Sequence, residues 1–282
     1  MQLACVHTRG VLGLNAPAVT VEVHLSGGLP GLVIVGLAET AVKESRERVR
    51  AALVQCGFEV PNRKITVNLA PADLRKSGGR FDLAIAIGVL AASGQLPAGP
   101  LAAHEFFGEL AFSGALRPVP GLLPALMAVP GERRAVVPLA NAGEAGLLGN
   151  SGVLAADHLL AIARHLQGTQ ALPGVAVEPA VAAAAPSHDL RDVHGQLHAR
   201  RALEIAAAGG HNVLLVGPPG VGKSMLARRL PGLLPPLSDA EALEVAALFS
   251  LKSASVGREW RQRPFRAPHH TASVTALIGG GS

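Results

Sequence analysis

One eight-residue motif at residues 217–224 (GPPGVGKS) constrains the fold of this chain more than any other feature of its sequence. It fits the pattern G-x-x-x-x-G-K-[ST], a phosphate-binding loop that joins a β-strand to an α-helix. An apolar run at residues 211–216 (HNVLLV) precedes it, and a helical pattern follows at residues 223–230, before Pro231. The apolar run predicts a central parallel strand covered on both faces. We therefore expect an α/β fold here, and a structural glycine turn is the alternative.

The residue types of this loop suit a bound nucleotide. Gly220 and Gly222 permit backbone angles that other residues resist, and they keep side chains out of the phosphate path. The amides of residues 221–225 can converge on phosphate oxygens at the start of the following helix. Lys223, the predicted catalytic residue, would reach the β- and γ-phosphates of ATP, and the Ser224 hydroxyl would bind Mg²⁺. The predicted site comprises Gly217, Pro218, Pro219, Gly220, Val221, Gly222, Lys223, Ser224 and Met225.

The composition excludes several classes of protein. The 282 residues are 49% hydrophobic and 16% charged, so packed cores are expected and global disorder is excluded. Cys5 and Cys56 are too few for a disulfide scaffold and are predicted to be reduced thiols in a cytoplasmic protein. The first residues lack the pattern of a signal peptide, and glycine and proline interrupt the longest charge-free stretch, residues 83–103. We expect neither secretion nor membrane insertion.

The net charge of +5 is unevenly distributed along the chain. Residues 1–188 hold 14 basic and 13 acidic groups, a net charge of +1, whereas residues 189–282 hold 11 and 7, a net charge of +4. The excess in the last third permits contact with nucleic acid without requiring it. A solvated surface with a few extra arginines is the alternative.

The remaining patterns predict two domains. Apolar alternation and short apolar runs predict strands at residues 19–24, 32–35, 64–70, 110–116 and 135–138. Helical spacing predicts helices at residues 39–57, 81–92, 122–128, 156–166 and 203–208. A proline- and alanine-rich segment predicts an interdomain linker, and a short docked helix is the alternative. We expect an N-terminal domain at residues 1–167, the linker at 168–188 and the first part of a second domain at 189–282.

Several segments resemble a known family. Residues 192–224, from DVHGQ to GPPGVGKS, look like the start of an AAA+ ATPase module. More closely, they resemble the ComM/YifB-type magnesium-chelatase-like AAA+ ATPases, and residues 263–271 (RPFRAPHHT) with 276–282 (ALIGGGS) look like a hallmark of that family. GLAETAVKESRERVRAAL and RKITVNLAPADLRKSGGRFDLAIAIGVLAASGQL resemble its N-terminal domain. The resemblance covers nearly all of the chain.

The resemblance implies further site residues. In AAA+ proteins the region matching Val193 and Gly195 lies against the adenine, so these two residues are predicted base contacts; an ordinary turn is the alternative. His269 and His270 match an inserted region typical of the chelatase-like clade. Because adjacent residues of a strand point to opposite faces, we expect this pair not to chelate a metal.

The N-terminal domain resembles the Lon-protease-like version of the ribosomal-S5 second-domain fold. Lon-type peptidases use a serine nucleophile and a lysine base. The nucleophile position falls on Arg80, and Ser77 and Lys76 are displaced from it by about three positions. We therefore expect no peptidase activity, and we expect Lys76 and Arg80 to be surface or partner contacts.

In the family, the Walker-B strand, which ends in a carboxylate pair, is expected just beyond Ser282. Glu241 and Glu244 lie on a helical pattern and are predicted to be solvated helix charges. The sensor residues, arginine finger and helical lid are expected beyond this chain as well. We therefore expect a fragment or truncated product that contacts nucleotide but hydrolyses ATP poorly.

The resemblance also implies a role for the full-length protein. It implies a homo-oligomeric ring, a hexamer, that moves on DNA and acts in branch migration during natural transformation and recombination. A magnesium-chelatase subunit is one alternative. A non-catalytic module that binds nucleotide or a partner is the other.

Overall fold

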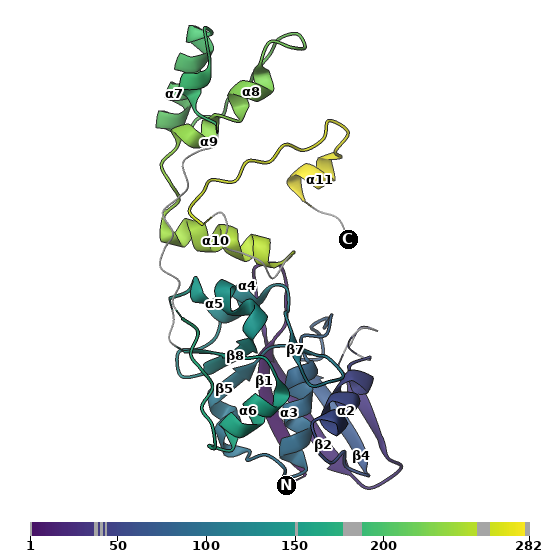
Figure 1. Ribbon diagram of the computed structural model, residues 1–282. Helices are drawn as coiled ribbons and strands as arrows, with labels where there is room; N and C mark the ends of the chain where they lie inside the picture. Colours follow the sequence, from purple (N-terminus) through teal and green to yellow (C-terminus); the bar gives the residue numbers. More distant parts are fainter. Residues whose placement is uncertain are drawn as a thin grey trace. The chain divides into compact units, whose positions relative to one another are not determined.

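The computed structural model describes residues 2–36, 39, 42, 44–149, 152–176, 188–252 and 260–279 (Figure 1). Contacts between residues divide the chain into two units. The first contains residues 1–181 and 243–258, and the second contains residues 182–242 and 259–282. The predicted linker lies mostly in residues 177–187, outside the described residues, so the domain division made from the sequence stays a prediction.

A seven-stranded mixed sheet forms the centre of the first unit, in the order β3-β4-β2-β1-β5-β8-β9. Its strands are β1 (Leu3–Arg9), β2 (Ala18–Ser26), β3 (Gly31–Val35), β4 (Lys64–Ala70), β5 (His104–Phe106), β8 (Arg134–Pro138) and β9 (Val153–Ala156). The β1–β2 and β2–β4 pairings are antiparallel, and the other four are parallel. The predicted α/β class is confirmed.

Helices cover both faces of this sheet. One apolar cluster joins the sheet to α2 (Ser45–Gln55), α3 (Asp82–Ala92) and α6 (Leu159–Leu166). A second cluster joins it to α4 (Leu122–Met127) and α5 (Ala142–Gly146). Strand β8 contributes to both, because its side chains alternate: Val136 belongs to the first cluster, and Ala135 and Val137 belong to the second.

A glycine lets the fully buried helix α3 lie close to the sheet. All eleven residues of α3 are buried. A Cβ atom built on Gly88 would lie 2.5 Å from Cγ2 of Val23 and 3.5 Å from Cγ2 of Val6. The backbone of α3 therefore approaches β1 and β2 more closely than any larger residue would allow.

Gly88→Ala is expected to lower the free energy of unfolding by about 1–3 kcal/mol, because overpacking against Val23 outweighs the better helix propensity of alanine. Urea denaturation followed by far-ultraviolet circular dichroism measures the change. The matched control is Gly143→Ala in α5, where a new Cβ atom meets nothing within 4 Å. This control should be neutral or stabilising. Equal effects of the two substitutions would contradict the predicted close packing.

The two edges of the sheet differ. The chain itself covers the β9 edge: the Ala155 amide donates to the Pro173 carbonyl at 3.0 Å, and the Val175 amide donates to the Val153 carbonyl at 2.9 Å. The start of the predicted linker is thus part of the first unit. On the opposite side, β3 ends the sheet, and among the described residues it pairs with β4 alone.

Two local predictions for the first unit are wrong. Residues 110–116 form no single strand but a hairpin of β6 (Glu109–Leu110) and β7 (Leu116–Arg117), because the chain turns at Gly114, whose φ is +90°. The helix predicted from residue 156 begins instead at Leu159, since residues 153–156 form β9. The His158 ring caps this helix by accepting from the Leu160 amide at 3.2 Å.

Lys76 and Arg80 are buried, which contradicts the prediction of surface contacts. The Lys76 ammonium donates to the Pro71 carbonyl, and burial lowers its pKa. The Arg80 guanidinium donates to the carbonyls of Arg9 and Pro120, and burial lowers its pKa to about 10. Hydrogen bonds to backbone carbonyls thus replace the water that both cations lose on burial. Whether these carbonyls lie within reach depends on how the chain folds around them.

The second unit consists of short helices joined by irregular segments. Its elements are η3 (Leu190–Asp192), α7 (Leu197–Gly209), α8 (Lys223–Ala227), α9 (Leu230–Leu233), the start of α10 (Asp239–Ser250) and α11 (Val274–Ile278). The helix predicted at 223–230 therefore ends at Ala227. Pro231 does not stop it but lies in the first turn of α9, where a missing amide donor costs little.

The strand predicted at residues 211–216 is not formed. The side chains of Leu214 and Val216 are 87% and 84% exposed, although Leu215 packs on a small apolar cluster. A strand is held by hydrogen bonds to neighbouring strands. Residues 188–252 and 260–279 include no strand that could pair with this segment.

Candidate nucleotide-binding site

The phosphate-binding loop has a backbone that glycine makes possible. Gly220 has a φ of +85° and Gly222 a φ of +91°, a region that residues with a side chain rarely adopt. Gly222 is also the N-cap of α8. A Cβ atom built on Gly222 would lie 3.2 Å from both Nε2 of Gln196 and Cε of Met225, so a side chain would fill this part of the loop.

Lys223 and Ser224 are the first two residues of α8. The Lys223 ammonium donates to the carbonyls of Gly217 at 2.7 Å and Pro218 at 2.8 Å. The Ser224 side chain is exposed. Within the described ranges, no Asp or Glu side chain forms a hydrogen bond or ion pair with either residue. A lysine cation, a free hydroxyl and backbone amides therefore gather here, a combination that suits an anion such as phosphate.

Gln196 contacts the loop, although it is not among the site residues predicted from the sequence. Its side-chain amide donates to the Val221 carbonyl at 2.9 Å. Its backbone has a φ of +49°, which is uncommon for a residue other than glycine. Gln196 belongs to the DVHGQ segment, so the signal was present in the motif, but its contact with a residue 25 positions away depends on the tertiary structure.

The two predicted base contacts differ in their surroundings. Val193 is 2% exposed and belongs to an apolar cluster with Leu190, Leu203 and Leu226. Gly195 is exposed and has a φ of +69°, and it directly precedes Gln196. The bond from Gln196 to Val221 thus brings the DVHGQ segment to the phosphate loop. Contact with adenine stays a prediction for both residues.

His269 and His270 were predicted to lie on a strand, with their side chains on opposite faces. This prediction is wrong, because residues 269 and 270 form no strand. The centres of the two rings lie 4.1 Å apart with an angle of 38° between their planes, so the rings face each other rather than opposite sides. His269 Nδ1 lies 2.8 Å from the Thr271 hydroxyl. In the part of the chain that the structure describes, no group of three or more His, Cys, Asp or Glu side chains is placed to hold a metal ion.

Two arginines that precede these histidines form hydrogen bonds with residues at or just before the start of α10. Arg261 Nε donates to the Asp239 carboxylate at 2.8 Å, and Arg263 Nε donates to the Pro235 carbonyl at 2.7 Å. Glu241 accepts from both the amide and the hydroxyl of Ser238 at 2.8 Å, which lowers its pKa. Glu244 is exposed. Glu241 and Glu244 thus lie on the exposed side of a helix, as predicted.

Gln196→Ala is expected to weaken nucleotide binding by about 2- to 10-fold, the range for loss of one net hydrogen bond that holds the loop. Isothermal titration calorimetry with Mg–ATP measures this change. Gln170→Ala, an exposed glutamine of the first unit, is the matched control. An unchanged dissociation constant for Gln196→Ala would show that its bond to Val221 does not support binding.

Comparison with known proteins assigns the chain to a family. A family model described as subunit ChlI of Mg-chelatase matches residues 21–141, and one described as magnesium chelatase, subunit ChlI, matches residues 189–282. Both parts of the chain are thus magnesium-chelatase-like. The described residues contain no helix long and apolar enough to cross a membrane.

Two similar relatives place the chain more specifically within this class of protein. The chain is 57% identical to YifB of Escherichia coli and 51% identical to the competence protein ComM of Haemophilus influenzae. These alignments cover 100% of this chain, but only 56% and 57% of the relatives, so the chain spans little more than half of their length. The chain belongs to the magnesium-chelatase-like AAA+ family and, within it, to the ComM/YifB type.

Proposed function

We propose that this chain binds Mg–ATP at residues 217–225. The observation that carries this proposal is the loop with two left-handed glycines, Gly220 and Gly222, that places Lys223 and Ser224 at the start of α8. On binding, the Lys223 ammonium exchanges the carbonyls of Gly217 and Pro218 for phosphate oxygens. The Ser224 hydroxyl would help to hold a Mg²⁺ ion, which would supply positive charge against the phosphates. Gly195 and Val193 are the proposed adenine contacts.

The proposed activity of the chain by itself is nucleotide binding with little turnover. Hydrolysis requires a carboxylate to hold Mg²⁺ and orient the attacking water. Among the described residues, no Asp or Glu carboxylate is bonded to Lys223 or Ser224. Steady-state phosphate release by the chain, with Lys223→Ala as the control, tests this proposal. Robust turnover that disappears in the Lys223→Ala variant would show that the chain carries a complete catalytic site.

For the longer protein, we propose a DNA-directed ATPase that works as a homo-oligomeric ring in the cytoplasm. A relative aligned over the whole chain is named a competence protein, and residues 189–282 carry a net charge of +4. DNA binding by full-length protein, titrated at several salt concentrations, tests this role. Phosphate contacts predict a steep fall of affinity with salt, and binding without that fall would argue against it.

A magnesium-chelatase subunit is the second candidate, and it is favoured by the match of both parts of the chain to family models of the chelatase subunit ChlI. We propose a Lon-protease-like fold for the N-terminal domain, and we prefer the DNA-directed role, because a relative aligned over the whole chain is named a competence protein. Magnesium insertion into a porphyrin by the full-length protein together with chelatase partners would reverse this preference.

A further inference from the structure

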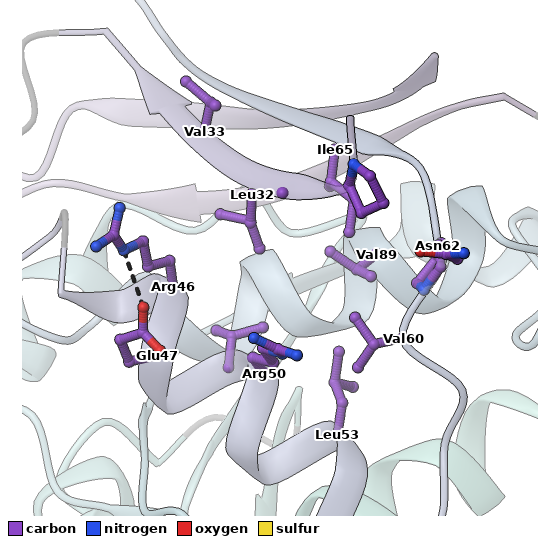
Figure 2. A pocket seen from close by; sticks show the side chains of 14 residues that line it. Leu32, Val33, Arg46, Glu47, Arg50, Leu53, Val60, Asn62, Ile65 and Val89 are labelled. Carbon is purple, nitrogen blue, oxygen red and sulfur yellow. Dashed lines mark hydrogen bonds and ion pairs between the residues drawn. The ribbon is translucent and has the colours of Figure 1, made fainter. Parts of the chain in front are cut away.

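A groove of about 470 Å³ lies between helix α2 and strand β3 in the first unit (Figure 2). Its floor is apolar: Val49, Leu53, Ile65 and Val89 line it and belong to the core of the unit. Leu32 points from β3 toward α2, and Val33, which also lines the groove, points to the other side of the strand (Figure 2). The groove is therefore shaped to take an aliphatic side chain beside the edge of the sheet.

Strand β3 offers free backbone groups along this groove. The Gly31 amide donates to the Arg63 carbonyl, so residues 31, 33 and 35 direct their backbone groups toward β4. In a parallel ladder, the alternate residues Leu32 and Ile34 then direct their amides and carbonyls outward. No hydrogen bond joins these outward groups to a residue that the structure describes. The edge can pair with another strand.

The sequence of β3 does nothing to prevent such pairing. Proteins commonly protect an edge strand with a charge, a proline or a covering segment. Strand β3 (GLVIV) contains neither charge nor proline, and its Val33 and Val35 are 46% and 43% exposed. The β9 edge of the same sheet, in contrast, is covered by the chain itself at residues 173–175. The two edges of the sheet therefore differ: the β9 edge is covered by the chain, and the β3 edge is open to another strand.

The helical rim of the groove is positively charged. Arg46 and Arg50 of α2 line it on the exposed face of the helix. Arg46 is paired with Glu47 at 3.1 Å. Arg50 forms no ion pair or side-chain hydrogen bond with the described residues. A ligand with a carboxylate on the groove side would complement this charge.

We propose that the β3 edge and this groove bind an extended peptide segment of a partner protein. The segment adds to the sheet as a strand beside β3, with its backbone bonded to Leu32 and Ile34. Because alternate residues of a strand share a face, an aliphatic residue in the groove and an acidic residue two positions away both face α2. The carboxylate pairs with Arg50. The partner is therefore recognised by alternating aliphatic and acidic residues in an extended segment.

The test uses the whole chain and a labelled probe peptide, Thr-Glu-Thr-Leu-Thr-Glu-Thr, whose leucine and glutamates share one face. Fluorescence anisotropy measures its affinity, and hydrogen exchange measures protection of the Leu32 and Ile34 amides. We expect the probe to bind and to protect both amides. Arg50→Glu should weaken binding about five- to tenfold at low salt, since it replaces attraction by repulsion at an exposed rim.

Two controls separate this site from general charge effects. Arg164→Glu reverses an exposed arginine on α6, away from the groove residues, and should leave the affinity unchanged. A probe with lysines in place of glutamates should not bind. The proposal is overturned if the glutamate probe does not bind, binds Arg50→Glu equally well, or leaves exchange at Leu32 and Ile34 unaltered. Pairing of two copies through β3, seen as a dimer that Arg50→Glu disrupts, would also overturn it. So would an Arg50→Glu variant that loses DNA binding but keeps its affinity for the peptide, because Arg50 would then contact DNA instead.

Discussion

Lys223→Ala is expected to lower the affinity of the chain for Mg–ATP by about 10- to 100-fold. The expected size follows from the loss of charged hydrogen bonds to phosphate, each of which contributes about 1.5–3 kcal/mol. The ammonium already lies at the loop, bonded to the carbonyls of Gly217 and Pro218 at 2.7 and 2.8 Å. Little rearrangement is therefore needed for it to meet a phosphate.

Isothermal titration calorimetry of the variant and the parent chain with Mg–ATP measures this loss. Lys252→Ala, at an exposed lysine outside the loop, is the matched control and should bind like the parent. Circular dichroism checks that Lys223→Ala retains its helices. If the variant binds Mg–ATP as tightly as the parent, residues 217–225 are not the nucleotide site.

Glu105→Ala is expected to lower the free energy of unfolding by about 3–5 kcal/mol, the cost of leaving a buried charge without its partner. The Glu105 side chain is 1% exposed and lies between two arginines. Arg9 donates to it through two nitrogens, at 2.8 and 3.1 Å, and Arg133 donates at 3.2 Å. Removal of this carboxylate leaves the buried Arg9 guanidinium in the core, and among the described residues the Ala16 backbone carbonyl is then its remaining hydrogen-bond acceptor.

Urea denaturation followed by circular dichroism measures this effect, with the exposed Glu132→Ala as the control. A double variant, Arg9→Met with Glu105→Leu, separates a buried unpaired charge from a lost contact. It removes both charges, so it should be more stable than Glu105→Ala. A double variant as unstable as the single one would mean that packing, and not the uncompensated Arg9 charge, accounts for the loss.

The sequence by itself predicted the elements whose signal is local. The alternation in residues 64–70 matches β4 along its whole length, and the apolar run at 81–92 contains α3. Burial of Val49, Ala52 and Leu53 on one face of α2 follows the predicted helical spacing. The glycine positions of the phosphate loop were also predicted, because only glycine readily adopts the required backbone angles at Gly220 and Gly222.

Other features were decided by the tertiary structure, because they depend on partners far away in the sequence. An apolar run such as 211–216 becomes a strand only where another strand pairs with it, and among the described residues of the second unit none does. Lys76 and Arg80 are buried because distant carbonyls receive their hydrogen bonds. Gln196 reaches the phosphate loop, and β3 lies at an open edge, only once the chain has folded. Local patterns determine what a segment can form, and long-range contacts decide where its polar groups find partners.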